Sequence, residues 1–207
     1  MKIGILGGGN VGGALANLAH AAGHDVRIGQ RVAGPLANGW DAVALEDAAA
    51  HGEIVIIALP YVACAEALPP LAQRLSGKIV VDATNPLNAD WSPLLLGQEN
   101  SAAEEIARLL PASQVVKAFN TVFADAMTPE RLLRDSGHRM TAFVAADDAA
   151  AANAVADLAQ SLGFAPLRVG SLANARYAEA IAHLNIAIAV GGGGGTNAGF
   201  LYDQVRG

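Results

Sequence analysis

The sequence predicts an α/β fold in which a doubly wound, mostly parallel sheet carries helices on both faces. Three observations predict this fold. Short apolar runs alternate with segments of helical composition along most of the chain. Most of these runs are continuous rather than alternating with polar residues, as is typical of parallel strands buried on both faces. Glycine or proline stands at many of the junctions, and regular alternation of strands and helices builds open parallel sheets.

The first three predicted elements form one β-α-β unit. Lys2–Leu6 is a short apolar run that ends in glycines, and it predicts a buried strand. A signal peptide could also begin this way, but the early glycines favour the strand. Val11–Ala22 has helical composition and ends before Gly23, a common residue at helix C-termini. Asp25–Ile28 predicts the second strand of the unit.

The same alternation continues to residue 169. Glu53–Leu59 predicts a strand that Pro60 ends, and a helix is predicted after it over Tyr61–Leu75. Ser101 and Glu104 form a capping box at the start of a later helix. The other predicted strands are Trp40–Leu45, Lys78–Asp82, Val115–Phe119, Met140–Ala145 and Pro166–Val169, and the other predicted helices are Ser101–Leu110 and Asp148–Leu162.

The C-terminal part has no strand after its last predicted helix. Ala173–Val190 predicts a long amphipathic helix, which we expect to pack on the crevice at the strand ends. Its apolar face is also a candidate contact in a homodimer. Gly191–Gly195 is a run of five glycines, for which we favour a flexible linker over an ordered ligand loop. The chain is therefore divided into an α/β domain, residues 1–170, and a C-terminal helix with a glycine-rich tail, residues 171–207.

Composition excludes several classes of function. The 207 residues are 53% hydrophobic and 15% charged, which suffices for a sizeable core. Thirteen Lys and Arg against nineteen Asp and Glu give a net charge of −6, so a nucleic-acid partner is not expected. No apolar run approaches the roughly 18 residues of a membrane span, so no membrane partner is expected. The single cysteine, Cys64, excludes an internal disulfide and cysteine-based metal sites, which favours a cytoplasmic location.

The segment GGGNVG, residues 7–12, carries the strongest motif of the chain. It matches G-x-G-x-x-G and lies between the first predicted strand and the first predicted helix, as in a Rossmann-type dinucleotide-binding fold. In that fold Gly7 permits the tight turn, Gly9 lets the backbone approach a pyrophosphate, and Gly12 lets the helix pack close to the strand. The amides of Gly9, Asn10 and Val11 would face the phosphates. The alternative is that the glycines serve only a tight turn.

The end of the second predicted strand indicates which dinucleotide is bound. An acidic residue there would bind the ribose hydroxyls of NAD, but the chain has Gly29, Gln30 and Arg31. Gln30 can donate hydrogen bonds, and Arg31 can pair with the extra phosphate of NADP. The alternative is that Arg31 is an ordinary surface cation. These residues favour NADP(H) as the cofactor.

Other predicted strand ends should line the same crevice, because ligands in open α/β sheets bind at the carboxyl ends of the strands. Leu59 and Pro60 stand at one of these ends, and Asn85 follows the next. Asn120 and Thr121 follow a third. The polar side chains among them suit a nicotinamide amide and ribose hydroxyls, although asparagine also simply forms turns.

Conventional catalytic side chains are missing from the sequence. There is no H-E-x-x-H motif and no nucleophile elbow, and the five histidines share no metal-ligand spacing. Cys64 lies in a predicted helix among Ala and Val, which favours a buried inert thiol over a nucleophile. For His183 a structural role is favoured. What remains is hydride transfer between two bound rings, for which no catalytic residue is assigned.

Four segments together resemble the reductases that pass hydride between NADPH and the deazaflavin coenzyme F420. They are GGGNVG at residues 7–12, GQR at 29–31, VKAFNTV at 116–122 and GSLANAR at 170–176. The NADPH-oxidising domains of the six-transmembrane epithelial antigen of prostate metalloreductases are similar too. The likeness covers about residues 1–190. Its KAFNT and LANAR parts are much more specific than the glycine motif.

The resemblance implies the position of each part of the cofactor. It implies that the phosphates lie at Gly9, Asn10 and Val11 and that the adenosine phosphate lies at Gln30 and Arg31. The family often has a further basic residue after this arginine, where the present chain has the sequence GPL. The run of five glycines is a second departure, in the part that would cover the second ring system. The resemblance further implies that Leu59 and Pro60 lie by the nicotinamide ribose, and Ala118, Asn120 and Thr121 by the nicotinamide.

The sequence therefore predicts an NADPH-dependent oxidoreductase that transfers hydride between the nicotinamide and a deazaflavin or flavin-like acceptor. The residues 1–170 would be its NADP-binding domain, and a small molecule would be its hydride partner. An alternative from another class is a non-catalytic NADP(H)-binding module that senses or regulates redox state. Both would bind the cofactor, so only turnover separates them.

Overall fold

The computed structural model describes residues 1–94, 96 and 99–203, and in that part of the chain nine strands form one sheet. The strands are β1 (Lys2–Leu6), β2 (Asp25–Gln30), β3 (Gly34–Pro35), β4 (Asp41–Ala44), β5 (Ile54–Ile57), β6 (Ile79–Asp82), β7 (Gln114–Lys117), β8 (Thr141–Ala146) and β9 (Ala165–Arg168). Their order is β3-β4-β2-β1-β5-β6-β7-β8-β9. The pairs from β4 to β7 and the pair β8–β9 are parallel, whereas β3 and β8 run antiparallel to β4 and β7.

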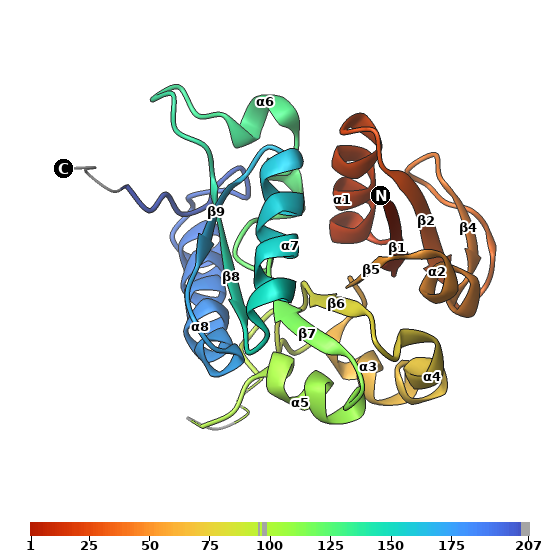
Figure 1. The fold of residues 1–207 in the computed structure, drawn as a ribbon. Coiled ribbons are helices and arrows are strands. Elements are labelled where there is room, and N and C mark those ends of the chain that lie inside the picture. Colours follow the sequence, from red (N-terminus) through yellow and green to blue (C-terminus); the bar gives the residue numbers. More distant parts are fainter. Residues whose placement is uncertain (95, 97–98, 204–207) are drawn as a thin grey trace.

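Helices cover both faces of this sheet, which confirms the predicted fold class (Figure 1). The helices are α1 (Asn10–Ala21), α2 (Leu45–His51), α3 (Tyr61–Ala67), α4 (Ala72–Leu75), α5 (Ala102–Leu109), α6 (Pro129–Leu132), α7 (Ala149–Ser161) and α8 (Ala175–Ile186). Helices α1 and α7 contribute to one hydrophobic core, whereas α2, α3 and α5 contribute to another. Across the described residues, no helix has both the length and the apolar character needed to cross a membrane.

Strand β5 shows why the predicted strands are continuously apolar. All four of its side chains are buried. Ile54 and Ile56 join the core beneath α1 and α7, whereas Val55 and Ile57 join the core beneath α2 and α3. Burying one such side chain contributes about 1.5–3 kcal/mol. The central strand therefore ties both layers of helices to one sheet.

Two predicted helices are shorter in the structure than the sequence indicates. The segment Tyr61–Leu75 is wrong as one helix, because Pro69 and Pro70 have no N–H to donate to the preceding turn. Helix α3 ends before these prolines, and a 3₁₀ turn, Pro69–Leu71, leads into α4. The segment Ala173–Val190 consists of a 3₁₀ turn, α8 and a π-helical turn over Ala187–Gly191.

Three elements were not predicted from the sequence. Helix α2 begins at Leu45, directly after β4, inside the stretch for which only a strand was predicted. The short β3 and the single-turn α6 lie in segments with no clear periodicity. Residue Thr128 caps α6 by accepting a hydrogen bond from the Arg131 amide at 3.3 Å. Such short elements span too few residues to show a periodic pattern of apolar residues, so the sequence does not predict them.

The five glycines after α8 form a hydrogen-bonded turn, so the prediction of a flexible linker is wrong. The amides of Gly192 and Gly194 both donate to the carbonyl of Ile188 at 3.1 Å. Gly193 and Gly195 have φ angles of 69° and 73°, in the left-handed region that glycine adopts readily. The chain after this turn meets the start of β8, where the Thr141 amide donates to the carbonyl of Phe200 at 3.1 Å. The division of the chain at residue 170, and a dimer contact through the exposed Leu184 of α8, stay predictions.

Candidate functional site

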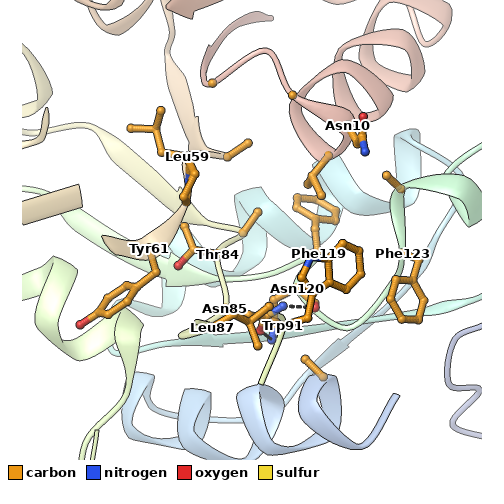
Figure 2. A pocket seen from close by; sticks show the side chains of 18 of the residues that line it. Asn10, Leu59, Tyr61, Thr84, Asn85, Leu87, Trp91, Phe119, Asn120 and Phe123 are labelled. Carbon is orange, nitrogen blue, oxygen red and sulfur yellow. Dashed lines mark hydrogen bonds between the residues drawn. The ribbon is translucent and has the colours of Figure 1, made fainter. Parts of the chain in front are cut away.

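A cleft of about 980 Å³ lies at the carboxyl ends of the central strands. Its walls come from the loops after β1, β5, β6 and β7, from α8 and from the chain after the glycine turn (Figure 2). This is the edge where open parallel sheets bind ligands. The predicted site residues that line it are Gly7, Gly9, Asn10, Val11, Gln30, Leu59, Pro60, Asn85, Asn120 and Thr121. Three other predicted residues, Gly12, Arg31 and Ala118, are not part of its lining.

The glycine loop has the geometry that close approach of a phosphate requires. Gly7 has a φ of 108°, and a Cβ on Gly12 would lie 1.9 Å from the carbonyl oxygen of Gly7. Gly12 is therefore needed by the packing of α1 on the loop. A Cβ on Gly9 would meet no protein atom within 4 Å, and Gly9 lines the cleft. No side chain of the described residues caps the N-terminus of α1, so its first amides are available to an anion.

A reciprocal asparagine pair joins the loops after β6 and β7. The Nδ2 of Asn120 donates to the Oδ1 of Asn85 at 2.9 Å and to the carbonyl of Ala178 at 3.1 Å. The Nδ2 of Asn85 donates to the carbonyl of Asn120 at 2.8 Å. These bonds settle which atom of Asn120 is the nitrogen, because both of its partners are acceptors.

Two buried side-chain oxygen atoms, one of them within this pair, have no hydrogen-bond partner among the described residues. They are the Oδ1 of Asn120 and the Oγ1 of Thr84, and both residues line the cleft. A buried polar atom without a partner costs about 1–3 kcal/mol. A ligand that donates N–H or O–H groups at this point would remove that cost.

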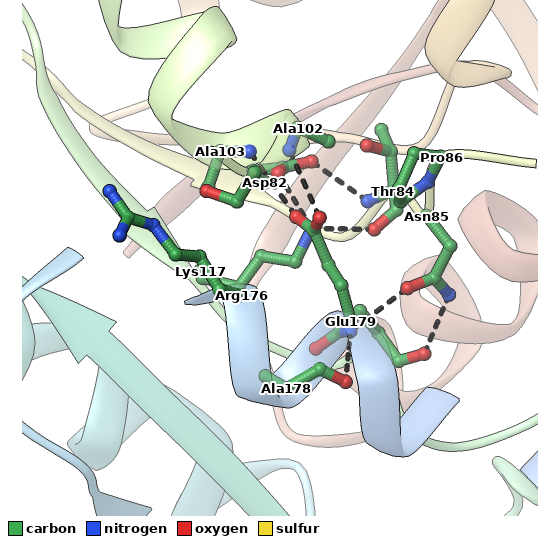
Figure 3. A network of polar contacts seen from close by, with 12 residues as sticks. Asp82, Thr84, Asn85, Pro86, Ala102, Ala103, Lys117, Arg176, Ala178 and Glu179 are labelled. Carbon is green, nitrogen blue, oxygen red and sulfur yellow. Dashed lines mark hydrogen bonds and ion pairs between the residues drawn. The ribbon is translucent and has the colours of Figure 1, made fainter. Parts of the chain in front are cut away.

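A buried ionic network lies behind the cleft (Figure 3). The Nζ of Lys117 lies 2.8 Å from Asp82 Oδ2, 2.8 Å from Glu179 Oε1 and 2.7 Å from the carbonyl oxygen of Thr84. Burial alone would lower the pKa of Lys117, but the charges of Asp82 and Glu179 outweigh that effect and raise the pKa. The amine therefore stays protonated and bound between two carboxylates.

Glu179 extends this network from the sheet to the helices. Its carboxylate accepts the amides of Ala102 at 3.0 Å and Ala103 at 3.3 Å, at the N-terminus of α5. A second ion pair joins the same helices, because Arg176 of α8 lies 2.6 Å from Glu104 of α5. The hydrogen bond from Arg176 lowers the pKa of Glu104. Helix α8 is thus fixed on α5 and on the ends of β6 and β7, where it forms one wall of the cleft.

Arg31 lies outside the lining of the cleft, next to Gln30, which is part of it. Its guanidinium is 3.9 Å from the Oε2 of Glu66 on α3, and the two side chains are 75% and 83% exposed. An exposed pair at this distance is weak, so the guanidinium is free to take another partner.

Cys64 and His183 are both held away from the cleft. Burial, reinforced by the charge of Asp82, raises the pKa of Cys64 to about 12, so the thiol is protonated at neutral pH. This agrees with a buried inert thiol. The Nε2 of His183 lies 3.2 Å from the carbonyl oxygen of Pro86, so the ring joins α8 to the loop after β6.

Sequence reasoning missed a large part of the site. The charged Asp82 and Lys117 stand at the ends of apolar strands, which is a signal that each has a buried partner. Glu179 had no such signal within its helix. Other residues that line the cleft and were not predicted as site residues include Thr84, Leu87, Trp91, Phe123, Asp125, Ile186 and Thr196.

Comparisons with known proteins give the family. Residues 2–86 match the family described as "NADP oxidoreductase coenzyme F420-dependent". An F420-dependent NADP reductase from Methanothermobacter thermautotrophicus is 31% identical over 208 residues, covering 90% of this chain and 88% of that protein. The chain belongs to this family of NADP oxidoreductases. The earlier resemblance is thereby confirmed.

Two further relatives agree with the family. The crystal structure of a putative F420-dependent NADP reductase from Arthrobacter sp. FB24 superimposes with a TM-score of 0.86, at 32% identity, over 99% of this chain and 100% of that one. Metalloreductase STEAP3 from Rattus norvegicus is 35% identical over 184 residues. That match covers 87% of this chain but 36% of the rat protein, so the chain spans about a third of that relative's length.

Proposed function

We propose that the cleft binds NADP(H) and that this member of the family transfers hydride between the nicotinamide and a deazaflavin or flavin-like acceptor. The observation that carries the proposal is the open space at Gly9, beside the uncapped N-terminus of α1. A Cβ at this position would fill the space that a pyrophosphate needs. The same cleft continues to the polar strand ends, as a dinucleotide requires.

At the phosphate end, the proposed contacts come mainly from backbone. The amides of Gly9, Asn10 and Val11 would bind the pyrophosphate at the positive end of α1. Gln30 and Arg31 would bind the phosphate on the adenosine ribose, because neither carries a negative charge and Arg31 can form a charge-assisted pair. Gly12 would act only through the packing of α1.

At the nicotinamide end, the contacts come from side chains. Leu59 and Pro60 would lie by the nicotinamide ribose. The unpartnered Oδ1 of Asn120 would accept a hydrogen bond from the carboxamide of the nicotinamide. The unpartnered Oγ1 of Thr84 would form a hydrogen bond with another polar group of the cofactor. Asn85 holds Asn120 in position, and Thr121 lines the same wall. Ala118 would support this wall from the interior.

When bound, NADPH supplies a hydride from C4 of its nicotinamide. The chain's own contribution is to hold two rings in contact and to exclude water. We assign no acid–base residue: Cys64 is a protonated thiol outside the lining, and Lys117 is held between two carboxylates. The buried network keeps α8 in place as a wall of the site.

Steady-state oxidation of NADPH tests the proposal, with the deazaflavin, flavin mononucleotide, flavin adenine dinucleotide, ferric chelates and quinones as separate acceptors. We expect turnover with at least one ring acceptor and tight binding of NADPH by calorimetry. Tight binding without turnover on any acceptor would instead support a redox-sensing module. The family membership favours turnover. If NADPH did not bind, the proposed site itself would be refuted.

A further inference from the structure

One part of the cleft is built from the loop after β6, the loop after β7, and α8 with the chain that follows it. We call it the acceptor end, and it consists of Leu87, Trp91, Phe123, Asp125, Ile186 and Thr196. In Figure 2, Leu87 and Trp91 lie beside the Asn85–Asn120 pair, and Phe123 lies to one side of them. Apolar and aromatic side chains therefore adjoin the place proposed for the nicotinamide.

Trp91 is held at this end in an unfavourable backbone conformation. Its φ is 69°, in the left-handed region that few bulky residues adopt. The loop maintains it, because the Trp91 amide donates to the Asn88 carbonyl at 3.0 Å and the Asn88 amide donates to the Ser92 carbonyl at 2.9 Å. The residue is nevertheless 50% exposed. Strain that presents a half-exposed aromatic ring to a cleft is typical of a ligand contact.

The charges of the cleft restrict the ligand further. Among the described residues that line it there is no Lys or Arg, and the one charged side chain is Asp125. The carboxylate of Asp125 accepts a hydrogen bond from Thr196 at 2.6 Å. The guanidinium of Arg131 bonds to the backbone carbonyl of Asp125, and Arg131 is not part of the lining. A phosphate at the acceptor end would thus face a carboxylate with no lining cation to offset it.

We propose that the acceptor end binds an uncharged, planar, two-electron acceptor ring stacked on Trp91, and that it does not recognise an acceptor's phosphate. A flavin ring and a quinone share this chemistry. The proposal rests on the proposed function, since the ring must lie beside the nicotinamide. Hydride passes from C4 of NADPH to the ring, and a proton from water completes its reduction. NADP⁺ and the two-electron-reduced ring are the products.

Tryptophan fluorescence tests the stacking directly, because the chain has two tryptophans. Trp40 is outside the cleft lining, where its indole donates to Asn17 at 2.8 Å and packs edge-on against His20. Riboflavin and menadione are titrated separately into the protein without NADPH, with inner-filter correction. We expect at least one of them to quench the Trp40→Phe variant and to leave the Trp91→Phe variant nearly unquenched. Equal quenching of both variants, or quenching of neither, would overturn the proposal.

A second variant separates loss of the ring contact from loss of the loop. Trp91→Gly removes the indole at a position where φ favours glycine, so the loop should keep its shape. Equilibrium dialysis of the quenching ligand should show roughly tenfold weaker binding, while calorimetry shows unchanged NADPH binding. Unchanged ligand binding in this variant would refute Trp91 as the stacking residue.

The recognition of phosphate is tested with riboflavin and flavin mononucleotide, which share one ring and differ by a phosphate. We expect their kcat/KM values as acceptors to agree within about threefold, and the deazaflavin to gain nothing from its anionic tail. A larger preference for the phosphorylated flavin or for the deazaflavin would refute the proposal. The ring titrations contain no NADPH, so they report on the acceptor end even if the proposed NADP(H) site fails.

Discussion

The two ends of the cleft are built in different ways. The glycine loop offers backbone atoms: its shape requires Gly7 and Gly12, whose Cβ atoms would overlap backbone oxygens, and the missing side chain of Gly9 leaves the cleft open. The acceptor end offers side chains from three separate segments: the loop after β6, the loop after β7, and α8 with the chain that follows it. The comparison teaches that a site made from local backbone can be recognised in one short motif. A site assembled from distant side chains cannot.

The largest expected effect separates two glycines of the same loop. Gly9→Val should abolish binding of NADPH and leave the protein folded, because the new side chain would enter the open space of the cleft. Gly12→Val is the matched control and should prevent normal folding, since even its Cβ would overlap the carbonyl oxygen of Gly7. Calorimetry and thermal unfolding measure the two effects. A folded Gly9→Val variant that binds NADPH as tightly as the parent would contradict the proposed phosphate site.

The second prediction concerns the buried ionic network that fixes α8, one wall of the cleft. Lys117→Ala would leave Asp82 and Glu179 buried with no cation between them. Removing one partner from a buried ion pair typically costs about 3–5 kcal/mol, so we expect a loss of that size in the free energy of unfolding. Arg108→Ala, which removes an exposed ion pair with Glu105, should cost less than about 1 kcal/mol. Urea denaturation measures the free energy of unfolding of both variants. Equal losses would show that the buried network contributes no more stability than an exposed ion pair.

This difference also explains what the sequence could predict. The β-α-β unit, the glycine loop at residues 7–12 and the central strand β5 follow from local patterns, so they were predicted with nearly correct bounds. Lys117 is bound by Glu179, 62 positions away, and nothing in the sequence of α8 selects that glutamate from its neighbours. Trp91 lies in a polar loop whose hydrogen bonds set a φ that no periodicity predicts. The pairing of side chains that are distant in the sequence is therefore the feature of the site that only the structure shows.

The third prediction tests which dinucleotide is preferred at the end of the cleft that holds the glycine loop, Gln30 and Arg31. Arg31→Ala should weaken NADPH binding by roughly ten- to a hundredfold, because a charge-assisted bond of this kind contributes about 1.5–3 kcal/mol. Binding of NADH, which lacks the extra phosphate, should change little. Gln30→Asp should shift preference toward NADH by placing a carboxylate against that phosphate. Dissociation constants at one fixed salt concentration decide the matter, and equal losses for both cofactors would mean that Arg31 only supports the loop.

The smallest effect comes from the residue that competes for Arg31. Glu66 lies 3.9 Å from that guanidinium, and both side chains are largely exposed, so their attraction is within about 1 kcal/mol. A phosphate bound by Arg31 would have to displace Glu66 or share the cation with it. Glu66→Gln should therefore tighten NADPH binding by less than about fivefold, and the gain should shrink at high salt. In the Arg31→Ala background the same substitution should have no effect, because the competition requires the arginine. A gain of the same size in both backgrounds would mean that Glu66 repels the cofactor directly and that Arg31 is not its target.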